Sequence, residues 1–96
     1  MINTITELKI SPEFTNVAEV EAGKVYQISF KLDKTSIPHI HLHTEDQRCI
    51  CPIPVSSEFL IANRTYRYPI APKHNGYISI KTTRSATMYD IVIEEV

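Results

Sequence analysis

Apolar and polar residues alternate along much of this chain. The run Lys24 to Leu32 (KVYQISFKL) is apolar at every second position, and Gly76 to Thr82 (GYISIKT) follows the same rule. Tyr89 to Val96 (YDIVIEEV) also alternates, so we expect its first residue, Tyr89, to share a buried face with the two isoleucines that follow. These segments predict three half-buried β-strands, the last two joined by a polar hairpin loop, Thr83 to Thr87.

Five further segments have weaker strand character, and turn residues separate them. No window keeps a helical period over a helix's length. Glu58 to Asn63 fits either a strand or a single helical turn. The sequence therefore predicts an all-β fold, a small antiparallel two-sheet sandwich of jelly-roll-like form with about eight strands, and one domain spanning residues 1–96. The weaker strands are Thr4 to Ile10, Asn16 to Val20, Ile37 to His43, Arg48 to Ile53 and Thr65 to Ile70.

Charge excludes some classes of partner. The chain has ten Lys and Arg residues and eleven Asp and Glu residues, which gives a net charge of -1, and it contains no basic stripe. We therefore expect neither nucleic-acid binding nor attachment to a membrane surface. The first ten residues (MINTITELKI) lack the basic and apolar regions of a signal peptide, which predicts synthesis in the cytoplasm.

Three segments carry a family resemblance. A strand opening Gly-Lys-Val-Tyr (Gly23 to Tyr26) precedes a Pro-x-x-x-Gly-Tyr-Ile-x-Ile segment (Pro72 to Ile80), and Tyr-Asp-Ile-Val-Ile (Tyr89 to Ile93) closes the chain. This order resembles small jelly-roll and pre-peptidase C-terminal type β-sandwiches. The resemblance implies a non-catalytic accessory module that binds glycans or proteins. The chain departs from typical glycan-binding members in having no Trp.

The segment IPHIHLHTEDQRCICP holds an unusual set of side chains. His39, His41 and His43 alternate with apolar residues, so a strand would place all three imidazoles on one face. Imidazole and thiolate are good ligands for zinc and other transition metals. Cys49 and Cys51 are spaced so that a regular strand would point them to one side, too far apart for a disulfide, and we expect free thiols.

The loop between His43 and Arg48 decides whether the cysteines join the histidines. An even loop, Glu45-Asp46 or Thr44 to Gln47, would place Leu42 opposite Cys49 and turn both cysteines to the core. An odd loop, Glu45 to Gln47, would place His43 opposite Cys49 and His41 opposite Cys51, on one shared face.

Three other interpretations of this segment remain open. In the first interpretation, the histidines face solvent and the cysteines are small core residues. In a symmetric oligomer, His-x-His pairs from two chains would share a metal. His39-x-His41-x-x-x-Glu45 also resembles the first metal motif of cupins, which implies these three as ligands. The flanking glycines of that motif are missing, and His74 is the one candidate for its later histidine.

A second candidate site lies near Thr65 to Ile70. Tyr66 and Tyr68 alternate with Arg67, and Arg64 precedes them. Tyr and Arg are favoured contact residues in protein interfaces, so these four are our candidate binding residues. The alternative is a strand with the tyrosines in the core and the arginines in solvent.

The leading functional hypothesis is a non-catalytic binding or assembly module. Its partner would be a protein, including a second copy of itself, or a glycan, and it would suit a virion accessory protein. We expect no enzyme activity, because no strained nucleophile turn accompanies the cysteines, and no cofactor. The alternatives are a metal-binding, cupin-like protein or enzyme that holds a divalent transition metal on His39, His41 and His43, and an inhibitor that presents the loop Pro52 to Ser57 (PIPVSS) to a host enzyme.

Overall fold

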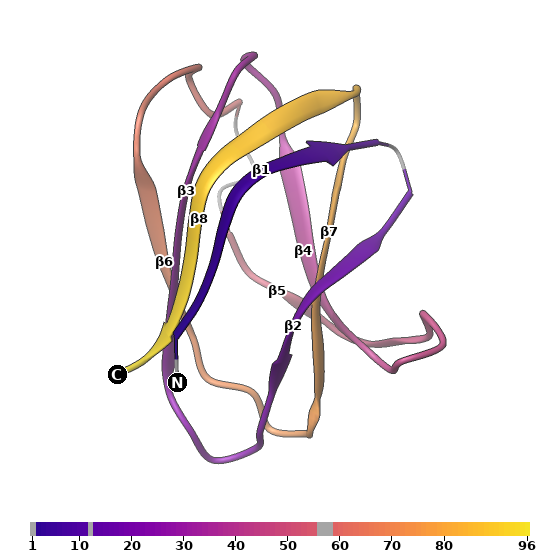
Figure 1. The fold of residues 1–96 in the computed structure, drawn as a ribbon. Coiled ribbons are helices and arrows are strands. Elements are labelled where there is room, and N and C mark those ends of the chain that lie inside the picture. Colours follow the sequence, from indigo (N-terminus) through magenta and orange to yellow (C-terminus); the bar gives the residue numbers. More distant parts are fainter. Residues whose placement is uncertain (1, 12, 56–58) are drawn as a thin grey trace.

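Eight antiparallel strands form two sheets that pack face to face (Figure 1). The computed structural model describes residues 2–11, 13–55 and 59–96. These described residues form no helix, so none is long and apolar enough to cross a membrane. The all-β two-sheet prediction is confirmed. The strands are β1 (Ile2–Ile10), β2 (Thr15–Val20), β3 (Tyr26–Leu32), β4 (Pro38–His43), β5 (Cys49–Ile53), β6 (Tyr66–Ile70), β7 (Gly76–Thr82) and β8 (Ala86–Glu95).

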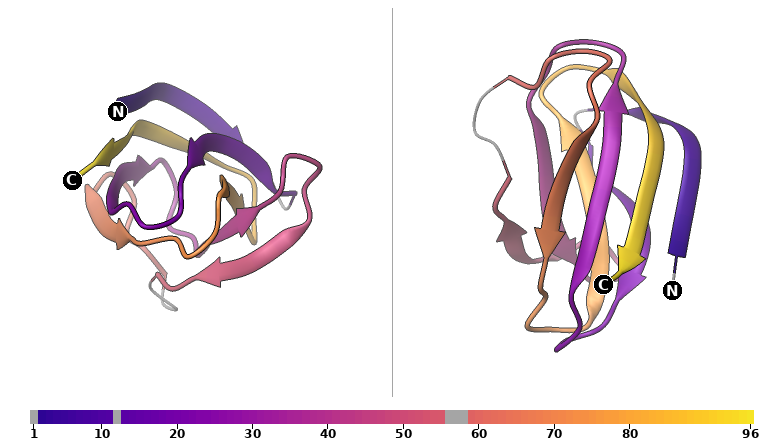
Figure 2. Two further views of the ribbon diagram at one scale, coloured as in Figure 1. Left: turned by 90° about the horizontal axis from the view of Figure 1, so that it is seen from below. Right: turned by 90° about the vertical axis from the view of Figure 1, so that its left-hand side faces the viewer.

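The strand order is that of a long hairpin rolled into a sandwich. One sheet has the order β1-β8-β3-β6 and the other β2-β7-β4-β5. First pairs with last, second with seventh, third with sixth and fourth with fifth. This is the strand order of a jelly roll. The two sheets face each other in both views of Figure 2. Among the eight described strands, only β4 and β5 are consecutive strands of one sheet, whereas every other pair of consecutive strands is divided between the two sheets.

The core lies between the sheets and follows the alternation of the sequence. Every second residue of β3 is buried, from Tyr26 to Leu32, and β7 contributes Ile78 and Ile80. Fully burying an aliphatic or aromatic side chain contributes roughly 1.5–3 kcal/mol relative to exposure. The hydroxyl of Tyr26 also accepts a hydrogen bond from the Glu21 N–H at 2.9 Å, so its polar end is satisfied.

Two expectations about the last strand are wrong. β7 and β8 belong to different sheets, so their connection crosses the sandwich and is not a hairpin. Tyr89 does not share the buried side of Ile91, because Asp90 has φ 50° and the buried positions change parity there, from Met88 to Ile91. The sequence did not reveal this change of side, because a positive φ at a non-glycine residue has no signature in the hydrophobic pattern.

The connection between β5 and β6 contains no described helical turn. Leu60 forms an isolated antiparallel bridge with Ser36, with hydrogen bonds in both directions, and its side chain is buried. The ambiguous segment Glu58 to Asn63 is therefore extended at Leu60. Residues 56–58, which include the end of the candidate inhibitory loop Pro52 to Ser57, lie outside the described residues.

Gly76, the first residue of β7, lies against the end of β4. A Cβ at this position would meet the His43 carbonyl oxygen at 2.8 Å and the side chains of Leu42 and Ile50 at 3.1 Å. The His43 carbonyl belongs to the backbone and cannot move away from an added Cβ as the end of a flexible side chain could. The absence of a side chain here therefore allows the close approach of β7 to His43.

Replacing Gly76 by Ala should destabilise the fold. Crowding in a packed region costs roughly 1–3 kcal/mol, which outweighs the roughly 0.5–1 kcal/mol that Ala gains over Gly in a strand. Urea unfolding of Gly76→Ala, beside the exposed control Thr83→Ala, measures the difference. A free energy of unfolding equal to that of the wild type would show that this approach is not tight.

Candidate functional site

The β4–β5 hairpin turns through an odd loop. The Gln47 N–H donates to the Thr44 carbonyl at 3.1 Å, and the Thr44 N–H donates to the Arg48 carbonyl at 2.8 Å. Gln47 has φ 69°, the left-handed conformation that closes a three-residue hairpin loop. The loop is therefore Glu45 to Gln47, the odd one of the loops that the sequence left open.

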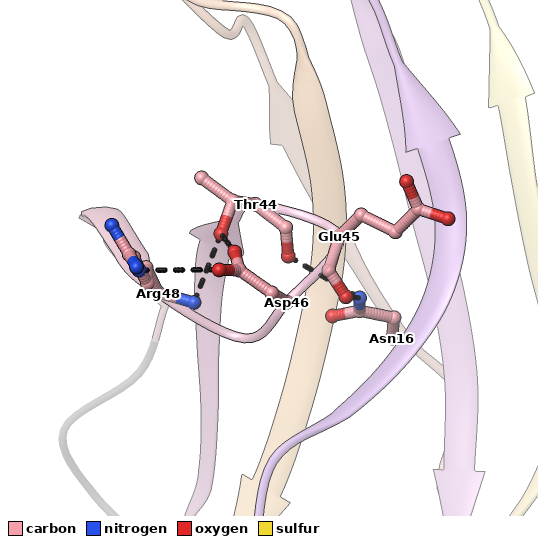
Figure 3. Close-up of polar contacts among 5 residues, drawn as sticks. All are labelled: Asn16, Thr44, Glu45, Asp46 and Arg48. Atoms are coloured by element: carbon pink, nitrogen blue, oxygen red, sulfur yellow. Dashed lines mark hydrogen bonds and ion pairs between the residues drawn. The ribbon is translucent and has the colours of Figure 1, made fainter.

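Polar contacts hold this loop in place (Figure 3). The Thr44 hydroxyl donates to the Asp46 carboxylate and accepts from the Arg48 N–H at 3.0 Å. The side-chain amide of Asn16, on β2, donates to the carbonyls of Thr44 and Glu45, each at 3.4 Å. The ion pair between Asp46 and Arg48 is highly exposed and adds little. The loop is thus fixed by its own turn and by β2.

A β-bulge follows the loop and separates the two cysteines. His43 pairs with Cys49, but Leu42 pairs with Cys51, so Ile50 is the extra residue. Cys49 is exposed beside the histidines, whereas Cys51 packs against the core. The expectation that both cysteines point to one side is wrong, because a bulge resets the alternation. Cys49 has the partner that the odd loop predicts, whereas Cys51 faces the core, as the even loop predicts, but opposite Leu42. Both thiols are free, as expected.

Three potential metal ligands come together at this bulge. His41 Nδ1 lies 3.3 Å from His43 Nε2 and 3.4 Å from Cys49 Sγ. All three donor atoms lie within 4.8 Å of one another. His43 is buried at 3% exposure, His41 is half-buried and Cys49 is exposed. We call these three residues the donor cluster; two imidazole nitrogens and one sulfur suit a transition metal.

The other residues considered as ligands lie outside the donor cluster. His39 is on the same strand, but it pairs with Lys81 of β7 and is not among the gathered donors. Glu45 is exposed in the hairpin loop, and His74 is exposed in the connection between β6 and β7. The structure thus brings together two of the three predicted histidines and adds Cys49 in place of His39.

Two residues that the sequence did not single out surround the donor cluster. The Phe14 ring lies 4.4 Å, centroid to centroid, from both His41 and His43, and the Lys81 ammonium lies 5.0 Å from the Phe14 centroid. Gln47 Oε1 lies 3.1 Å from His43 Nδ1. Phe14 and Gln47 lie in links between strands, where hydrophobic periodicity gives no information, whereas Lys81 lies on β7.

The setting of His41 disfavours its protonated form. Burial lowers the pKa of His41 below its ordinary value of 6.5, and positive charge on His43, His39 and Lys81 lowers it further. A neutral imidazole keeps a lone pair that can bind a metal.

The second candidate site lies on the edge strand β6. Tyr66 and Tyr68 pack against the core beside Phe30, with centroids 6.4 and 6.0 Å from its ring. Arg64 and Arg67 are exposed. Both tyrosines are half-buried, which lies closer to the alternative with the tyrosines in the core, and the arginines are the more exposed members of the set. A binding role for Arg64, Tyr66, Arg67 and Tyr68 stays a prediction.

A hollow of about 370 Å³ opens between the edges of the two sheets, near β5 and β6. Its lining includes four prolines together with Cys51, and its charged or titratable groups are Lys73 and His74. It contains no Tyr or Phe.

Comparisons with known proteins support the fold. No family model matches the chain, and no curated protein matches it in sequence. A solved structure from work on how "Bacillus endospore appendages form a novel family of disulfide-linked pili" is similar, with TM-score 0.56 and 9% identity, over 97% of this chain and 82% of that chain. At this identity the likeness shows a shared β-sandwich fold. The sandwich part of the resemblance is confirmed, whereas no match supports the pre-peptidase assignment.

An NMR titration of the metal-free, reduced protein tests the setting of His41. We expect its imidazole to titrate below pH 6.5, and to titrate higher in His43→Gln, because the variant removes a neighbouring positive charge. His74→Gln, a change outside the donor cluster, should leave the titration midpoint of His41 in place. A midpoint for His41 at or above 6.5 in the wild type would contradict the burial and charge described above.

Proposed function

We propose that the chain is a non-catalytic assembly module whose strand β1 pairs with β1 of a second copy. The observation that carries this proposal is the free edge of β1. The strand is nine residues long and pairs with β8 in one unshifted register, while no described strand pairs with its other side. An edge strand presents unpaired N–H and C=O groups that a further strand can use.

The other sheet edges carry features that discourage such pairing. β5 contains Pro52 and the bulge at Ile50, and β6 contains Pro69 beside the exposed Arg67. β2 has six residues and a register shift at Val17. Prolines, bulges, charges and short length are the devices by which proteins protect sheet edges. β1 has neither proline nor glycine and no register shift, and its exposed charges, Glu7 and Lys9, are of opposite sign.

The side chains of β1 also suit pairing with an identical strand. Glu7 and Lys9 are both exposed and two positions apart. In a two-fold antiparallel pair centred on Leu8, Glu7 of each copy would lie opposite Lys9 of the other. Opposite charges at facing positions contribute roughly 0.2–1 kcal/mol per pair, and the symmetry provides two such pairs.

The likeness to a pilus structure is consistent with assembly, since that fold occurs in disulfide-linked pili. It supports no particular mode of linkage in this chain. The other parts of the functional hypothesis, a glycan ligand, a virion location and a loop-presenting inhibitor, stay predictions. No contact among the described residues favours one of them over assembly.

A charge exchange on β1 tests the proposed pairing. We expect the wild type to form dimers or larger assemblies in sedimentation equilibrium. Glu7→Lys should weaken association several-fold or more, because it places like charges opposite each other. The double exchange Glu7→Lys/Lys9→Glu should restore it. Glu13→Lys, an equal change of charge on an exposed residue beyond β1, is the matched control.

Two results would contradict the proposed pairing of β1 with β1 of a second copy. One is a wild type that stays monomeric at millimolar concentration. The other is an association that Glu7→Lys weakens no more than Glu13→Lys does. Since all three residues are exposed, circular dichroism should find the same fold in each variant.

A further inference from the structure

We propose that His41, His43 and Cys49 bind one zinc ion per chain, with water as the fourth ligand. This inference does not depend on assembly, because the donor cluster lies on the β4–β5 hairpin and the proposed pairing uses β1. Two imidazoles and one thiolate favour zinc or a similar transition metal over Mg²⁺ and Ca²⁺, which prefer oxygen ligands.

The spacing of the donor atoms fits tetrahedral zinc. Zn–N bonds of about 2.0–2.1 Å and a Zn–S bond of about 2.3 Å require N···N near 3.4 Å and N···S near 3.6 Å. The His41 Nδ1 to His43 Nε2 distance is 3.3 Å, and the His41 Nδ1 to Cys49 Sγ distance is 3.4 Å. The third pair lies within 4.8 Å. A rotation of the exposed Cys49 side chain would bring the sulfur to a metal centred among the three.

Hydrogen bonds hold His43 in the tautomer that a metal needs. Gln47 Oε1 accepts from the Ser79 hydroxyl at 3.3 Å and lies 3.1 Å from His43 Nδ1. An amide oxygen only accepts, so His43 carries its proton on Nδ1 and its lone pair on Nε2, the atom that faces His41. Metal-binding histidines commonly donate their second N–H to a carbonyl or carboxylate in this way.

The backbone fixes both the ligands and this supporting contact. Cys49 reaches the histidines because the three-residue loop places it opposite His43, and the bulge at Ile50 then turns Cys51 to the other side. Gln47 reaches His43 because its φ of 69° closes the loop. Phe14 packs against both imidazoles. A site whose ligands are held before the metal arrives loses less entropy on binding.

Metal binding at this site is a ligand exchange without redox change. The S–H bond of Cys49 breaks, an S–metal bond forms, and the proton leaves to buffer. In the metal-free site His41 Nδ1 donates to His43 Nε2, so its proton moves to Nε2 when the metal takes the Nδ1 lone pair. Binding should therefore release about one proton per ion.

Cobalt titration of tag-free, reduced, chelator-treated protein tests the site directly. Tetrahedral Co²⁺ bound by a thiolate has a near-ultraviolet charge-transfer band and strong visible bands. We expect these bands to saturate at one equivalent and to disappear when Zn²⁺ is added. Cys49→Ser should lose the charge-transfer band, and the matched control Cys51→Ser should keep it. Both variants should keep their fold, since Cys49 is exposed and serine is close in size to cysteine.

A second variant tests the supporting contact. Asn tolerates the left-handed conformation of residue 47 but is too short to reach His43. Gln47→Asn should keep the charge-transfer band and bind zinc roughly 10- to 100-fold more weakly in competition with a chromophoric chelator. Unchanged affinity would remove Gln47 from the site.

Three outcomes would overturn the zinc assignment. They are absence of the bands in the wild type, their retention in Cys49→Ser, and their loss in Cys51→Ser. Half an equivalent of metal in a metal-dependent dimer would overturn the one-ion stoichiometry, because a second chain would then supply the fourth ligand. Thermal unfolding gives an independent measure: zinc should raise the midpoint of the wild type, as any ligand specific for the native state does, and not that of Cys49→Ser.

Discussion

The reversal of the chain at Glu45 to Gln47 is the constraint on which this structure depends. It pairs β4 with β5 near the middle of the sequence, and the remaining strands pair outward from it, ending with β1 against β8. A change in loop length would shift that first register and exchange the buried and exposed sides of β5. The Thr44–Gln47 turn and the amide of Asn16 resist such a change.

The bulge at Ile50 lets one short strand serve two purposes. Without the bulge, both cysteines of β5 would point to the same face of the sheet. With the extra residue, Cys51 packs against the core while Cys49 joins the histidines. The same irregularity blunts an exposed sheet edge. Metal binding and assembly are thus proposed for different edges of the sandwich, the bulged β5 and the regular β1.

Much of this fold could be predicted from alternation alone. The buried positions of β3 and the limits of β7 follow from hydrophobic period and turn residues. Alternation fails at Asp90 and Ile50, where positive φ or an extra residue resets the side that faces the core. Histidines at every second position indicated a shared face. The contacts of His41 and His43 with Cys49 and Gln47 depend on the loop conformation and the bulge, which cannot be recognised in a single sequence.

Cross-strand contacts in the β4–β5 hairpin test the central claim most directly. Nuclear Overhauser effects between backbone protons of the reduced protein report which residues face each other across the two strands. The structure predicts contacts that pair His43 with Cys49 and Leu42 with Cys51. Contacts pairing His41 with Cys51 would show an unbroken odd register, and contacts pairing Leu42 with Cys49 an even one. The first result would remove the bulge that separates the two cysteines, and the second would also take Cys49 away from His43 and so from the donor cluster.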